Sequence, residues 1–386
     1  MEEMNTEEHE EVESSSPEGQ AGVLHGINGR SLYLEFTGLL LGIDLSRMLE
    51  DHESVAAPLN FSLYLGEKTN FPMGMKHFKL GNKLYLLGGA ILDEEGKYIG
   101  GSNKVFEFVP NHSCPEESIK ECDMPLLRAP KCSLLVAEVR NLICVIHAMP
   151  YKHGVVPPKP MFEVYDRNDM EWRKLADPPG IVFGHYVVGE TLFIIGTEGL
   201  FYYNFLSKKW TRADEARSSF QYSPIELPKR AICLRDFQFG KDFHVMINVQ
   251  QRGSPQDEVA IYALVLNKNG LLVCCQELGQ IFSGVKIGLV KHFFFDLGWE
   301  VGDNKRMCAV LTGYGYDVQS SFIACVSIFN LRKLDNVALD NLPYPSDGFF
   351  TEFPGNTLFE VTVIRERICS LGNQIDKPCI GDAFLF

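Results

Sequence analysis

The chain has 386 residues, of which 45% are hydrophobic and 22% are charged, a composition typical of a globular protein with a sizeable core. Its formal net charge is −14, and an acidic surface repels phosphate backbones, so we expect no nucleic-acid partner. No apolar run approaches the ~20 residues that a membrane-spanning helix needs, so we expect no membrane association.

The first 22 residues differ from the rest of the chain. Residues 1–20 contain eight Glu and neither Lys nor Arg. A segment with so little apolar surface cannot offset the entropy lost on ordering, so we predict that residues 1–22 form a disordered acidic head. This head is either a solvated tail or an interaction tail around Ser14–Pro17. It has neither the basic start nor the apolar centre of a secretory signal.

From about residue 23 onward, short apolar runs alternate with clusters of Gly, Pro, Asn and Asp. Runs of this length that are rich in Val, Ile, Leu, Phe and Tyr predict buried strands. The one helix candidate, residues 45–53, is equally compatible with a loop. Residues 23–386 are therefore expected to form a single all-β domain. The clearest strand candidates are Lys83–Leu87, Leu142–His147, Thr191–Ile195, His244–Val249, Ala260–Leu266 and Phe322–Phe329.

Two segments share a pattern of aromatic residues. Seven positions separate Tyr165 from Trp172, and the same spacing separates Tyr203 from Trp210. Each pair lies on either side of a polar turn, which predicts two adjacent strands. We expect the Tyr and Trp to pack between neighbouring sheets, where their large apolar area would hold one sheet against the next.

Glycines follow the preceding strand candidates. Gly88 and Gly89 follow the run 83–87, and Gly196 occupies the corresponding place in the unit that contains Tyr203. Glycine tolerates positive φ at little steric cost, so a glycine pair allows the chain to turn sharply as a strand ends.

This pattern resembles the kelch repeat, which builds β-propellers from blades of four antiparallel strands and ~50 residues. The resemblance is carried by residues 72–212, and later units are more degenerate. It implies a propeller, and both the length of the body and the number of units indicate six or seven blades. The matching positions are Gly88, Gly89, Tyr165, Trp172, Gly196, Tyr203 and Trp210.

The two ends of the body both have the character of strands. Ser31–Phe36 begins the body and Ala383–Phe386 ends it. In propellers the terminal strands often share one blade, which closes the ring, and we predict that arrangement here. We also predict two separate strands, Phe359–Ile364 and Arg367–Leu371, in the last unit, and a turn at 311–316.

The loose repeats and the turns that precede each Trp resemble plant kelch proteins of the F-box-associated kind. In that family the propeller receives a substrate protein, and an F-box ahead of it joins a ubiquitin ligase. Residues 1–22 lack the Leu- and Pro-rich helical pattern of an F-box. A link to ubiquitin ligation therefore follows from the resemblance only.

No catalytic motif is present in the sequence. The ten His are scattered without the spacing of a strand or helix pair, and no Cys-x-x-Cys, Gly-x-Ser-x-Gly or P-loop pattern occurs. We therefore expect no metal, no cofactor and no enzymatic activity. The alternative is a hydrolase or oxidase in the propeller channel, which would need inward carboxylates or a His cluster there.

The expected function is a protein-interaction scaffold or adaptor that binds a protein partner through loops on the propeller face. The longest loop candidates are residues 93–104, 149–159, 250–258 and 313–320. Tyr151, Lys152 and His153 give one of them a basic and aromatic character, which suits a protein contact, although a solvated loop is the alternative. We expect a monomer. Eleven scattered Cys without a secretory signal indicate reduced thiols, and hence the cytoplasm or nucleus.

Overall fold

The structure is a computed structural model. It describes residues 30–36, 38–50, 59–65, 71–148, 156–213, 232–239, 243–251, 259–267, 272–279, 281–282, 285–299, 304–315, 322–334, 358–371 and 382–385. The acidic head and the loop residues Tyr151, Lys152 and His153 lie outside the described residues.

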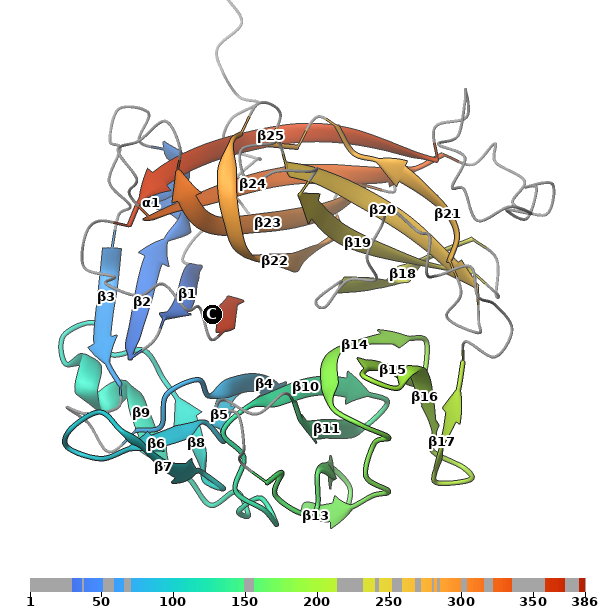
Figure 1. Cartoon of the computed structure of the whole chain (residues 1–386). Coiled ribbons are helices and arrows are strands. Elements are labelled where there is room, and N and C mark those ends of the chain that lie inside the picture. The colour runs from blue at the N-terminus through green and yellow to red at the C-terminus, as the bar shows by residue number, and fades with distance from the viewer. Residues whose placement is uncertain are drawn as a thin grey trace, which may run out of the picture.

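The chain forms six four-stranded antiparallel sheets, arranged as the six blades of a β-propeller (Figure 1). The predicted all-β class and the four-stranded blade are confirmed. Blade 1 consists of β26 (Asp382–Leu385), β1 (Ser31–Phe36), β2 (Leu39–Asp44) and β3 (Leu59–Tyr64); blade 2 of β4 (Lys76–Leu80), β5 (Lys83–Leu87), β8 (Val105–Phe108) and β9 (Ile119–Glu121); blade 3 of β10 (Leu134–Val139), β11 (Leu142–His147), β12 (Phe162–Asp166) and β13 (Glu171–Lys174).

The remaining three blades follow in chain order, each written from the inner strand outward. Blade 4 consists of β14 (Val182–Val188), β15 (Thr191–Gly196), β16 (Gly199–Asn204) and β17 (Lys209–Arg212); blade 5 of β18 (Ile232–Phe239), β19 (Phe243–Gln251), β20 (Val259–Asn267) and β21 (Leu272–Glu277); blade 6 of β22 (Ile287–Trp299), β23 (Asn304–Gly315), β24 (Phe322–Lys333) and β25 (Phe359–Ser370).

Three smaller elements decorate this ring. The hairpin β6 (Ala90–Leu92) and β7 (Tyr98–Gly101) projects between β5 and β8. A short helix, α1 (Leu45–Glu50), follows β2, so the helix candidate of the sequence is confirmed over its first part. A 3₁₀ turn, η1 (Pro115–Ser118), precedes β9.

The blades meet in a closed cycle. The inner strands contact one another in the order β26, β4, β10, β14, β18, β22 and back to β26. Six steps return to the starting strand, so the ring has six blades and the seven-bladed alternative is wrong.

The ends of the chain close this ring, as the sequence predicted. β1 pairs antiparallel with β26, so blade 1 takes three strands from the N-terminal region and one from the C-terminal region. Tyr33 of β1 stacks on Phe384 of β26 at 5.3 Å between ring centroids. The same Tyr33 ring lies 5.1 Å from Phe108 of blade 2. The closing pair is therefore packed against the next blade as well as paired within its own.

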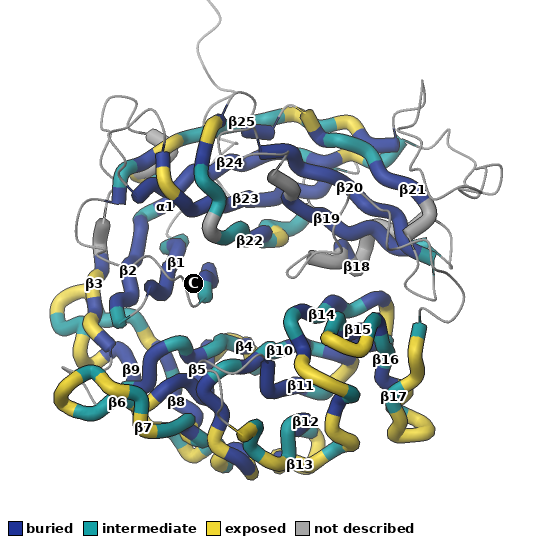
Figure 2. The backbone as a smooth tube through the Cα atoms, in the orientation of Figure 1, coloured by how far each residue is buried: buried dark blue, intermediate teal, exposed yellow. Residues whose placement is uncertain are grey.

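The core lies between the blades. Six clusters of buried apolar residues occur among the described residues, and each combines side chains of two neighbouring blades. Figure 2 shows the same distribution, with many buried strands, exposed turns and a largely exposed outer strand β17. Because both faces of the sheets are covered by neighbouring blades, strands such as β5 and β11 appear in the sequence as continuous apolar runs rather than as alternating patterns.

Two predictions in the last third of the chain were wrong, one of a strand break and one of a turn. Phe359–Ile364 and Arg367–Leu371 are not two strands, because β25 is one strand from Phe359 to Ser370 and pairs with β24 on both sides of a register shift at Ile364. The glycine-rich segment after Leu311 is not a turn, since β23 continues to Gly315. At Gly313 an added Cβ would lie 2.2 Å from the carbonyl oxygen of Gly288. Its glycine therefore serves the close approach of β22.

Candidate functional site

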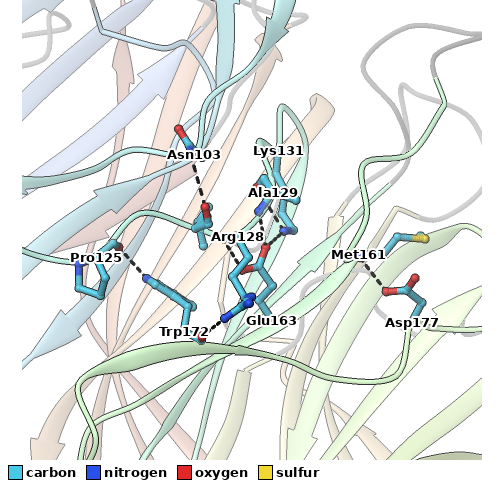
Figure 3. Close-up of polar contacts among 10 residues, drawn as sticks. Asn103, Pro125, Arg128, Ala129, Lys131, Met161, Glu163, Trp172 and Asp177 are labelled. Atoms are coloured by element: carbon cyan, nitrogen blue, oxygen red, sulfur yellow. Dashed lines mark hydrogen bonds and ion pairs between the residues drawn. The ribbon is translucent and has the colours of Figure 1, made fainter.

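The first predicted aromatic pair lies between blades 2 and 3. Tyr165 of β12 and Trp172 of β13 are directly opposite each other, with ring centroids 5.3 Å apart. Both side chains are buried in the cluster that also contains Phe78 and Leu87 of blade 2. The indole Nε1–H of Trp172 donates a hydrogen bond to the carbonyl of Pro125 at 2.8 Å (Figure 3). The Trp is thus fixed to the segment that connects the two blades.

The second aromatic pair repeats this geometry one blade further on. Tyr203 of β16 and Trp210 of β17 are directly opposite each other, with ring centroids 4.9 Å apart. Trp210 Nε1–H donates to the carbonyl of Ala176 at 2.8 Å. Phe162 of blade 3 lies 5.0 Å from the Tyr203 ring and 5.4 Å from Trp210. Trp172 is buried, whereas Trp210 is half-buried, so the two positions differ in how much they can contribute to stability.

Glycine is required at the predicted positions for two different reasons, the backbone conformation and the close approach of neighbouring atoms. Gly88 and Gly89 have φ values of 66° and 96°, in the left-handed region. A Cβ on Gly88 would also lie 2.1 Å from Cδ2 of Leu134. Gly196 has no such backbone conformation, but a Cβ there would lie 2.6 Å from the carbonyl oxygen of Ile181. All three positions therefore exclude a side chain at places where blades are built or joined.

A buried ion pair links the start of blade 3 to its third strand (Figure 3). Lys131 Nζ contacts Glu163 Oε1, and both side chains are fully buried. The Glu163 carboxylate also accepts the backbone N–H groups of Arg128 at 2.6 Å and Ala129 at 3.1 Å. Burial lowers the pKa of Lys131, and the Glu163 carboxylate opposes that effect. Through these contacts Glu163 holds the segment 128–131 against β12.

A buried histidine lies near this ion pair. His147 ends β11 with a residue exposure of 1%, and neither ring nitrogen has a hydrogen-bond partner within the described residues. Burial, followed by the charge of Lys131, lowers the pKa of His147 to about 4. The ring is therefore neutral at physiological pH and is closed off from solvent.

A second cluster of charged side chains lies on β26, its neighbour β1 and the adjoining part of blade 2, near blade 6. Glu35 of β1 is directly opposite Asp382 of β26, and the two residues therefore share one face of the sheet. Asp382 accepts the His77 backbone N–H at 3.1 Å, contacts His77 Nδ1 at 2.7 Å and lies 3.8 Å from Lys76 Nζ. The Gly74 N–H donates to Glu35 Oε1 at 2.5 Å.

Burial is the main influence on Glu35. Its residue exposure is 4%, and this burial raises its pKa to about 7. Asp382 raises it further, whereas the cations Lys76 and Lys291 and the Gly74 hydrogen bond lower it. This cluster was not predicted from the sequence, because its members come from distant parts of the chain.

A groove runs along the rim between blades 3 and 4, with a cavity volume of about 580 Å³. It is lined by the segment before β12, the end of β13, the connection to β14, and β16 with its following turn. Its cations are Lys159, Lys174 and Lys208. The rest of the lining is Pro160, Leu175, Ala176, Asp177 and Tyr203.

The charges in this groove are not balanced within the described residues. None of its three lysines forms an ion pair there. The one carboxylate, Asp177, accepts the backbone N–H of Met161 at 2.7 Å (Figure 3) and so holds the segment before β12. Lys159 is the last residue of 149–159, one of the loops predicted from the sequence to bind a partner. The groove itself was missed, because nothing in the spacing of the lysines indicates that they meet.

The described part of the chain contains no group of three or more His, Cys, Asp or Glu side chains that could hold a metal ion. No described helix is long and apolar enough to cross a membrane.

No protein-family model matches the sequence. No curated protein matches it either. Among solved structures, the chain is similar to the AfRom2 CNH domain (9% identity, 79% of this chain and 92% of that chain covered, TM-score 0.32). It is also similar to Kluyveromyces lactis Hsv2 (8% identity, 89% and 96% covered, TM-score 0.32). A third similar structure is a DUF4784 family protein from Bacteroides caccae (11% identity, 81% and 83% covered, TM-score 0.25).

Proposed function

We propose that this six-bladed propeller is a non-enzymatic interaction scaffold or adaptor that binds a protein partner and takes no cofactor. The observation that supports this function is the groove between blades 3 and 4. It combines an apolar floor with cations that are unpaired among the described residues, on a rigid ring whose blades are fixed by buried aromatic residues. Loops and grooves on such a scaffold can bind a partner without any change in the fold.

The finer assignment within this proposal is a kelch-type propeller of the plant F-box-associated kind. It is supported by the two Tyr–Trp pairs, which recur at the same place in blades 3 and 4, and by the glycine pair at the end of β5. On this proposal the protein is a cytoplasmic or nuclear monomer, and it presents a substrate protein for ubiquitin ligation.

One observation favours an enzyme as the second candidate. Glu35 of β1 and Asp382 of the inner strand β26 are opposite carboxylates with His77 beside Asp382, and paired carboxylates are what hydrolysis in the channel would require. Asp382 already accepts two contacts from His77, so this cluster is also fully explained as a support of ring closure.

The test of the scaffold is a pull-down that compares two matched variants of the full chain. Ala176 is exposed on the groove, and Ala176→Tyr fills the groove without changing the charge. Asn82→Tyr makes a similar change at an exposed turn between β4 and β5. We expect Ala176→Tyr to lose a protein that the wild type and Asn82→Tyr both retain. Equal retention by all three proteins would contradict a role for the groove.

A further inference from the structure

We infer that the groove between blades 3 and 4 binds an acidic, unphosphorylated segment of a partner protein that carries an apolar residue among its carboxylates. This inference rests on the proposed scaffold function and specifies the chemistry of the partner. It depends on three features of the groove: its charge, its floor and the type of its cations.

The charge of the groove is opposite to that of the protein. The chain as a whole has a net charge of −14, yet the groove presents three ammonium groups and one carboxylate. That carboxylate, Asp177, is engaged by a backbone N–H, as described above. A complementary partner therefore brings negative charge.

Several described surface cations on blades 2 to 4 are paired with carboxylates, whereas others, such as Lys97 and Lys120, form no ion pair among the described residues. The groove differs from both kinds because it brings three such unpaired lysines around one space. Pairing with a carboxylate reduces the attraction that a cation exerts on an external anion. Lys159, Lys174 and Lys208 have no such neutralising partner among the described residues, so their charge is available to a ligand. The neighbouring pairs are Lys83–Glu107, Lys104–Glu121, Arg140–Glu190, Arg167–Glu138 and Arg173–Asp169.

The floor of the groove indicates more than a charge contact. Pro160, Leu175 and Ala176 supply apolar surface, and the Tyr203 ring borders the same space. The carbonyl of Ala176 already accepts the Trp210 indole N–H. The floor therefore suits an apolar side chain of the ligand, whereas the lysines around it suit flanking carboxylates.

The cations are lysines without an arginine. Phosphate recognition favours clusters of Arg, because the guanidinium group can donate two parallel hydrogen bonds to one phosphate. Ammonium groups act as separate point charges, and here they come from three separate segments of the chain. That arrangement fits carboxylates distributed along a peptide better than one doubly charged group.

The experiment measures the fluorescence anisotropy of a labelled peptide, in which Glu and Asp flank a central Leu, with the full chain. We expect saturable binding that weakens from about 30 mM to about 300 mM salt, since screening shortens the range of the attraction. The double variant Lys174→Glu/Lys208→Glu should weaken binding by roughly tenfold. The matched control Lys97→Glu/Lys120→Glu makes the same charge change at exposed positions outside the groove and should bind as the wild type does.

Four results would overturn the inference. They are equal weakening by both double variants, equal binding of the Gln and Asn version of the peptide, binding only of a phosphoserine version, and binding only after residues 1–20 of the chain are replaced by a neutral sequence. The last result would mean that the acidic head of the chain occupies the groove. If the peptide fails while Ala176→Tyr still abolishes capture of a protein, the scaffold function stands and only the acidic chemistry is wrong. If the peptide does not bind and Ala176→Tyr does not change protein capture, the proposed scaffold function of the groove is wrong as well.

Discussion

Replacing Glu35 by Gln should make the protein more stable at alkaline pH and leave it nearly unchanged at acid pH. Glu35 is buried on the strand that closes the ring, opposite Asp382. Burial is the largest cause of a pKa that rises from 4.5 to about 7. Gln has nearly the same shape as the protonated Glu, and its carbonyl can accept the same N–H from Gly74.

The sign and size of this effect follow from linkage between protonation and folding. Because the folded state raises the pKa of Glu35, its protonated form stabilises the fold fully below pH 4.5, and this contribution is lost as the pH rises to about 7. The difference between the two pKa values corresponds to about 3 kcal/mol. Above this range the folded state contains a buried carboxylate beside Asp382. Lys76, Lys291 and the hydrogen bond from Gly74 compensate this charge in part.

Urea unfolding from about pH 4 to about pH 8 would measure the difference in unfolding free energy between Glu35→Gln and the wild type. We expect this difference to grow by about 3 kcal/mol in favour of the variant as the pH rises. Glu94→Gln, at an exposed turn, is the control and should show no such trend. A difference that stays constant over this pH range would refute the assignment of Glu35 as a buried, proton-binding group.

Three further substitutions test how the blades are held together. Trp172→Ala should lower the unfolding free energy by about 3–5 kcal/mol, because it removes a buried inter-blade ring and a hydrogen bond; an unchanged thermal midpoint would exclude this role. Lys131→Met should lower the unfolding free energy by about 3–5 kcal/mol, since it leaves Glu163 buried without its cation. Adding Glu163→Gln should recover much of that stability in urea unfolding, and no recovery would count against the pairing. Gly88→Ala should lower the unfolding free energy more than Gly81→Ala, because both glycines have positive φ but only a side chain at Gly88 would meet Leu134. Equal losses of stability in the same assay would mean that contact with Leu134 is not what requires glycine at position 88.

Much of the fold could be predicted because many strands nearer the centre of the ring are buried on both faces and so leave a continuous apolar run. Lys83–Leu87 and Leu142–His147 coincide with β5 and β11. The number of blades could not be decided in this way, since the strands of blade 6 are long. In β25 the charged residues 365–367 interrupt the apolar pattern, but the pairing with β24 only shifts register at Ile364 and the strand continues.

The candidate sites were less predictable than the fold. Tyr165 and Trp172 could be paired from their spacing, because a tight turn places such residues on neighbouring strands. The groove lysines come together only when blades 3 and 4 pack, and no local pattern encodes that contact. Glu163 did give a signal, since it is a charge inside an apolar strand run and therefore requires a buried partner. The same reasoning applies to Glu35.

The most direct test of the scaffold function is photo-crosslinking in cell extract from a position beside the groove. A photoreactive phenylalanine analogue at the exposed Lys209, directly after Lys208, would report contacts beside the groove without filling it, and the same analogue at Asn82 would report contacts of an exposed turn elsewhere. We expect position 209 to crosslink to a partner protein through an acidic peptide, and Lys174→Glu/Lys208→Glu to abolish this crosslink. Identical crosslinking patterns from positions 209 and 82, or crosslinks at position 209 that persist after both lysines are reversed, would contradict the scaffold function.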